Sequence, residues 1–119
     1  MALSDLRPAE MDILHRCMKA TAQDAALYPD WEFPTIFGLN RAEFITVLGA
    51  WPELDEAQLD VQLAIQNSLN NLLGYPHQYH DDWDKHFGFS KAELIQVFKK
   101  WRGALPESYF DGLILGDPL

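Results

Sequence analysis

The chain has little cysteine, which limits how it can be stabilised. Cys17 is the one cysteine among 119 residues, so no disulfide can form within the chain. That usage fits a reducing compartment. The first residues do not place a basic segment before an apolar one, and no apolar run approaches the roughly 18 residues of a membrane span. We therefore expect a cytoplasmic protein with no membrane segment.

Basic side chains are absent from the middle of the sequence. Between Arg41 and Lys85 there is no lysine or arginine, while eight acidic residues lie at 43–60 and 81–84, and the whole chain has a formal net charge of −9 at pH 7. An acidic surface repels phosphate backbones, so we expect no nucleic-acid partner. Such a surface either keeps the protein soluble or docks a basic protein.

Motifs for catalysis are missing as well. The sequence contains no P-loop, no glycine-rich dinucleotide fingerprint and no nucleophile elbow. Cys17 and His15 do not form a dyad, because residues two apart on a helix point in different directions. Cys17 is typical of a small buried apolar residue. We predict a protein that is not an enzyme and has no cofactor.

An internal repeat organises what is present. Residues 37–47 align with residues 87–97 in constant register, and Trp51 then falls on Trp101. Apolar residues recur at helical spacing in both segments. Each predicted helix also begins with a capping pair, which is Asn40 with Glu43 in the first segment and Ser90 with Glu93 in the second.

A long helix precedes each of these segments. Residues 6–11 resemble residues 54–59, and Asp55 with Gln58 forms a second kind of capping pair. We expect the long helices over about 8–26 and 56–73. Each ends near a tyrosine–proline pair, at 28–29 and 75–76, because proline cannot continue a helix.

Two such units predict an all-α protein. We expect one domain over 1–119 that forms a four-helix bundle from two tandem helix–loop–helix repeats, at about 6–52 and 54–103. Neither unit could bury its apolar face alone, so the halves should pack about a pseudo-twofold axis. The apolar residues of 104–119 predict a short C-terminal helix or a packed tail. Trp51 and Trp101 should be core residues, whereas Trp31 and Trp83 either seal the bundle ends or anchor a partner.

The acidic middle supplies the first candidate site. Its side chains would dock a basic protein partner, because complementary charge speeds encounter and sets specificity. The predicted partner-binding residues are Glu53, Asp55, Glu56, Asp60, Asp81, Asp82, Trp83 and Asp84.

The loop at 75–88 supplies the second candidate site, for a small ligand. Its candidate residues are Tyr75, His77, Tyr79, His80 and His86. Histidines beside aspartates can ligate zinc, but local hydrogen bonding also explains them, and no second ligand pair occurs elsewhere. A calcium loop is disfavoured, because His86 and Phe87 stand where an oxygen ligand and a glycine are needed. We predict no metal.

Part of the chain resembles small uncharacterised all-helical proteins of bacteria. The resembling residues are 70–77, Asp82 with Trp83, 90–94 and Trp101, which cover about one third of the chain. Some small acidic bacterial proteins of this size are immunity proteins that neutralise a toxin. By that analogy we expect a protein-binding module, an immunity protein in particular. The alternatives are a small-ligand or metal-binding protein using the 75–88 loop, and a structural homodimer.

Overall fold

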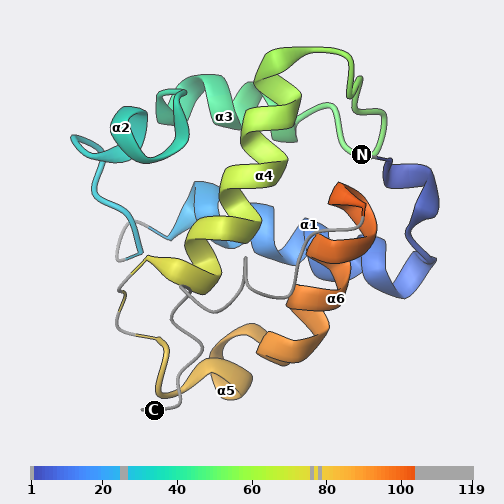
Figure 1. Ribbon diagram of the computed structural model, residues 1–119. Coiled ribbons are helices and arrows are strands. Elements are labelled where there is room, and N and C mark those ends of the chain that lie inside the picture. The colour runs from blue at the N-terminus through green and yellow to red at the C-terminus, as the bar shows by residue number, and fades with distance from the viewer. Residues whose placement is uncertain (1, 25–26, 76, 78, 104–119) are drawn as a thin grey trace.

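The computed structural model describes residues 2–24, 27–75, 77 and 79–103, and these residues form helices and no strands. The elements are a 3-10 helix, η1 (Leu3–Asp5), and α1 (Pro8–Gln23), α2 (Phe33–Phe37), α3 (Arg41–Leu48), α4 (Leu59–Gly74), α5 (Trp83–Phe87) and α6 (Lys91–Arg102). The all-α prediction is confirmed (Figure 1). The described chain has six α-helices where four were expected, because each loop between a long and a capped helix contains a five-residue helix. The predicted C-terminal helix or tail at 104–119 lies outside the described residues.

The same order of helices occurs in both halves of the described chain. A 16-residue helix is followed by a five-residue helix and then by a capped helix, first as α1–α3 and then as α4–α6. The buried positions of the two long helices also correspond. Leu14, Cys17 and Met18 are buried in α1, and the residues 51 positions later, in α4, are buried too: Ile65, Ser68 and Leu69.

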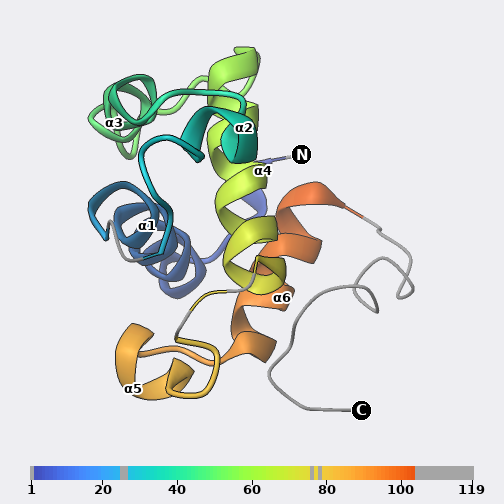
Figure 2. The same ribbon diagram turned by 90° about the vertical axis from the view of Figure 1, so that its left-hand side faces the viewer.

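The two long helices cross at the centre of the molecule (Figures 1 and 2). At their contact the Cys17 thiol lies 3.4 Å from the carbonyl oxygen of Ser68. Both α3 and α6 pack on α1 and on α4, α2 packs on α4, and η1 packs on α6. Each long helix is therefore covered by capped helices from both halves of the described chain.

The four tryptophans have different surroundings. Trp101 is fully buried and Trp83 nearly so, whereas Trp31 is 78% exposed. Trp51 is half-buried, and its ring stacks on the imidazole of His15 with centroids 4.6 Å apart. The core prediction is thus confirmed for Trp101 and holds in part for Trp51. Trp83 packs against the rings of Phe87 and Phe89.

The capping pairs begin α3 and α6 as the sequence indicates. The Asn40 side chain accepts from the Glu43 N–H at 2.8 Å, and the Glu43 carboxylate accepts from the Asn40 N–H at 2.9 Å. Ser90 and Glu93 make the same reciprocal pair. Gly38 and Gly88 precede these pairs with φ of 72° and 77°, a left-handed conformation that suits glycine.

The expected bounds of both long helices need correction. Helix α4 begins at Leu59 instead of 56, because Asp55 forms a turn in which its carboxylate accepts from the Ala57 N–H at 3.0 Å. This local bond competes with the expected capping box. Helix α1 ends at Gln23, because Asp24 is extended, with φ −96° and ψ 94°.

Candidate functional site

A groove of about 380 Å³ lies between α3, the turn at 49–58 and the first turn of α4. Its lining combines aliphatic and acidic side chains. The aliphatic ones are Val47, Ala50, Leu54 and Val61, and the acids are Glu43, Glu53, Asp55 and Asp60. Among the described residues no lysine or arginine lines it. Such a groove suits a cation carried on an aliphatic stem.

The chain reversal after α3 builds this groove. Helix α3 ends as the Gly49 N–H donates to the Ile45 carbonyl at 2.9 Å. The following turn is closed by the Glu53 N–H, which donates to the Ala50 carbonyl at 2.8 Å. The reversal brings the first turn of α4 back beside α3. There Val61 is buried while its neighbour Asp60 is exposed, because successive residues of a helix point in different directions.

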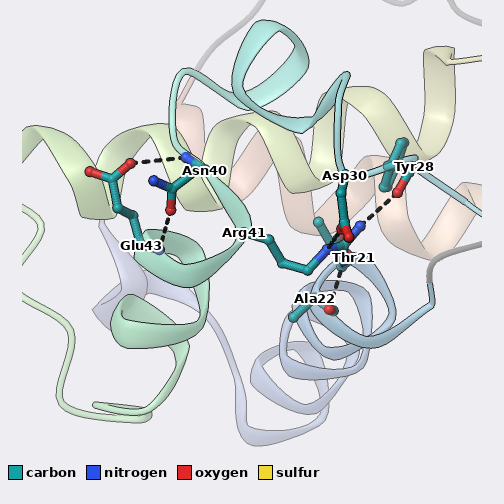
Figure 3. Close-up of polar contacts among 7 residues, drawn as sticks. All are labelled: Thr21, Ala22, Tyr28, Asp30, Asn40, Arg41 and Glu43. Carbon is teal, nitrogen blue, oxygen red and sulfur yellow. Dashed lines mark hydrogen bonds and ion pairs between the residues drawn. The ribbon is translucent and has the colours of Figure 1, made fainter.

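Arg41 holds the start of α3 against the end of α1 (Figure 3). Its guanidinium donates to the carbonyls of Thr21 at 3.1 Å, Ala22 at 2.7 Å and Tyr28 at 2.6 Å, and it pairs with Asp30. The Thr21 and Ala22 carbonyls belong to the last turn of α1, where no intrahelical donor remains for them. Sequence reasoning missed this role, because in the sequence Arg41 is recognisable only as the residue that follows the Asn40 cap.

The structure separates the residues that were predicted to bind a partner. Glu53, Asp55 and Asp60 line the groove. Residues 81–84 lie at the start of α5, at the opposite end of the molecule (Figure 1). Within them Trp83 is only 4% exposed, so its ring is not available as a surface anchor.

Glu56 belongs to neither group, because it links three segments of the fold. Its carboxylate accepts the indole N–H of Trp101 at 2.8 Å and the backbone N–H of Leu3 at 3.0 Å. The buried indole has its hydrogen-bond partner in this carboxylate. Glu56 therefore has a structural role in positioning η1 against α6.

The histidines of the 75–88 loop bind the end of α4 and each other. The Tyr79 N–H donates to Nδ1 of His77 at 3.2 Å, so Nε2 of His77 carries the proton and donates to the Leu72 carbonyl at 2.9 Å. Nε2 of His80 lies 2.9 Å from the Tyr75 carbonyl. The His77 and His80 rings stack with centroids 3.9 Å apart.

These contacts determine the protonation state of the loop histidines and whether they can coordinate a metal ion. Burial lowers the pKa of His77 to about 4 and also lowers the pKa of His80. Both nitrogens of His77 are engaged, which leaves no lone pair for a metal ion. Among the described residues no group of three or more His, Cys, Asp or Glu side chains is arranged to hold one. Local hydrogen bonding accounts for both nitrogens of His77 and for Nε2 of His80, whereas Nδ1 of His80 is buried without a hydrogen-bond partner among the described residues.

A shallower depression of about 320 Å³ borders the same loop. It is lined by Tyr79, Asp82, Lys85 and His86. The Tyr79 and His86 rings stack with centroids 3.6 Å apart, and Nε2 of His86 lies 3.4 Å from a carboxylate oxygen of Asp24. Its lining carries charges of both signs, so it favours no single class of ligand.

Comparisons with known proteins add no relative. No family model matches the chain, and neither the curated proteins nor the solved structures give a match. Within the described ranges, no helix combines the length and the apolar character that crossing a bilayer requires.

Proposed function

We propose that this protein is a non-catalytic protein-binding module that docks a basic partner in the groove between α3 and α4. The observation that carries the proposal is the composition of that groove. Acidic side chains stand beside aliphatic ones, and the surrounding stretch between Arg41 and Lys85 has no lysine or arginine to neutralise them. A basic partner would be steered to this face by long-range attraction and held there by contact with the aliphatic walls.

The proposal narrows the predicted docking surface to one of its two acidic segments. The acids at 81–84 lie beside the basic residues Lys85 and Lys91, and Lys91 stands 5.1 Å above the Trp83 ring. Attraction of a basic partner is weaker where cations already stand among the acids. The groove acids have no such neighbours in their lining and form the docking surface in this proposal.

A bacterial toxin is the partner class that we favour, which would make the protein an immunity protein of the cytoplasm. The support is the analogy of size, acidity and helical content with immunity proteins, together with a groove that suits a basic surface. The groove is the part of this proposal that mutations can test.

We further infer that the fold is two copies of one unit related by a pseudo-twofold axis. The shared helix order, the equal lengths of α1 and α4 and the matching buried positions support this inference. A second correspondence comes from cation–ring contacts. Arg41 stands 4.5 Å above Phe33, and 50 residues later Lys91 stands above Trp83.

Capture from a lysate of the source cell tests the proposed function. The protein, immobilised through a C-terminal tag, should retain a basic protein at low salt and release it at high salt. Neutralising the groove with Glu53→Gln, Asp55→Asn and Asp60→Asn should abolish capture. The matched control, Asp81→Asn, Asp82→Asn and Asp84→Asn, removes the same amount of charge. This variant should still capture the basic protein. Capture that is insensitive to salt, or equal for the two triple variants, would refute the proposal.

A further inference from the structure

The contact between α6 and α1 contains an ion pair that has no equivalent among the residues lining the groove. The ammonium of Lys100, on α6, lies 3.0 Å and 2.8 Å from the two carboxylate oxygens of Glu10, on α1. Glu10 is 6% exposed, and it also accepts from the backbone N–H of Arg7 at 2.9 Å. The hydrogen bond from Lys100 lowers the pKa of Glu10. A lysine side chain thus lies along this helix–helix contact and is paired with a buried acid.

The contact between α3 and α4 is the counterpart of this one in the other half. Each contact joins the capped helix of one half to the long helix of the other. Ala50 stands 50 residues before Lys100, in the register that places Trp51 on Trp101. Val61 stands 51 residues after Glu10, in the register of the buried positions of α1 and α4.

At this counterpart the lysine and its acid are replaced by smaller, apolar side chains. Ala50 and Val61 both line the groove. The place that the Lys100 side chain fills in one half is therefore open in the other. The negative charge of the groove comes from three other acids that line it, Glu53, Asp55 and Asp60.

We propose that the groove receives a lysine or arginine side chain of the docked protein, in the position that Lys100 takes in the other half. This inference rests on the proposed function and names the group that enters the site. The aliphatic stem would lie on Val47, Leu54 and Val61, and the cationic head would meet the acids. Arginine fits such a site well, since its planar guanidinium binds carboxylates through two N–H groups.

A tri-arginine peptide with blocked ends, followed by NMR of the ¹⁵N-labelled full chain, tests the inference. We expect shifts at low salt centred on the backbone amides of Val47, Ala50 and Val61. The Ala50→Lys variant supplies its own ammonium to the groove and should weaken binding by at least about tenfold. Thr35→Lys adds the same charge at an exposed position of α2 and should change the affinity by less than about twofold.

The outcomes separate this inference from the proposed function. Shifts confined to residues 79–86, or equal weakening by Ala50→Lys and Thr35→Lys, would overturn the groove as a receptor for one side chain. The absence of any salt-dependent shift would overturn it too. In each of these cases the lysate capture still decides whether the protein docks a basic partner. Groove-centred shifts that Ala50→Lys removes and Thr35→Lys keeps would establish the inference.

Discussion

At the scale of single residues, His77 shows how a polar side chain is fixed by its neighbours. It accepts from the Tyr79 N–H and donates to the Leu72 carbonyl, so one imidazole joins the loop to the last turn of α4. Protonation would place a hydrogen on Nδ1, where the Tyr79 N–H already points. The new charge would also face the stacked His80 ring and the Lys91 ammonium, and both oppose it.

This arrangement predicts a loss of stability in mild acid. The folded pKa of His77, about 4, is below the ordinary value of about 6.5, so the folded state binds fewer protons than the unfolded one. Its contribution is complete above pH 6.5 and is lost as the pH falls toward 4. We expect the free energy of unfolding to fall by about 1–2 kcal/mol from pH 7 to pH 5, allowing for partial exposure of the ring.

Urea unfolding at a series of pH values measures this loss. The His77→Asn variant has no imidazole to titrate at this position, and its stability should depend less on pH over the same range. NMR titration of the wild-type imidazole gives the folded pKa directly. A variant that keeps the full pH dependence, or an imidazole that titrates near 6.5, would show that His77 does not cause it.

Sequence reasoning identified the loop but left two interpretations of its histidines open. Spacing alone could not show that a backbone N–H would occupy the Nδ1 atom of His77. The same limit applies to Glu56, which was predicted to bind a partner and whose carboxylate accepts from the Trp101 indole N–H. The role of His77 depends on the path of the loop backbone, and the role of Glu56 depends on a group that is distant in the sequence and is brought close by the tertiary fold.

At the scale of elements, the ends of helices were predictable where local chemistry decides them. The pairs Asn40 with Glu43 and Ser90 with Glu93 sit within one turn, and both form as expected. Helices α2 and α5 were missed, because five residues carry too little periodicity to be recognised. The start of α4 was misplaced because Asp55 caps a local turn in preference to the helix.

A substitution at Arg41 tests how strongly the first half depends on the contact between the start of α3 and the end of α1. Replacing it with lysine keeps the charge but provides one ammonium for carbonyls that a guanidinium reaches with several N–H groups. We expect Arg41→Lys to lower the free energy of unfolding by about 1–3 kcal/mol. Amide hydrogen exchange should accelerate mainly in the last turn of α1.

The exposed Lys85, on α5, provides the control for this experiment. Lys85→Arg exchanges the same two residue types and should leave both the stability and the exchange rates near wild-type values. If Arg41→Lys were as stable as wild type, or if exchange accelerated evenly through the chain, the Arg41 hydrogen bonds between α3 and α1 would not contribute to stability as expected.

At the scale of the whole molecule, the two halves differ at the contact between a capped helix and a long helix, and the proposed docking site depends on that difference. The α6–α1 contact is closed by Lys100 and Glu10, while the α3–α4 contact is open and acidic. The sequence alone predicted the repeat and contained the acidic stretch. It could not show that Ala50 and Val61 meet at one groove, because the register of the long helices, 51 residues, appears only in their buried positions.

The stability of Ala50→Lys as a function of salt is the measurement that tests most directly whether the groove accepts a cationic side chain. At low salt the new ammonium should be attracted by the groove acids and raise the free energy of unfolding by about 0.5 kcal/mol relative to Thr35→Lys. At high salt this difference should disappear, because exposed charges are then screened. An Ala50→Lys protein that is less stable than Thr35→Lys at low salt, or a difference that salt does not change, would contradict the account.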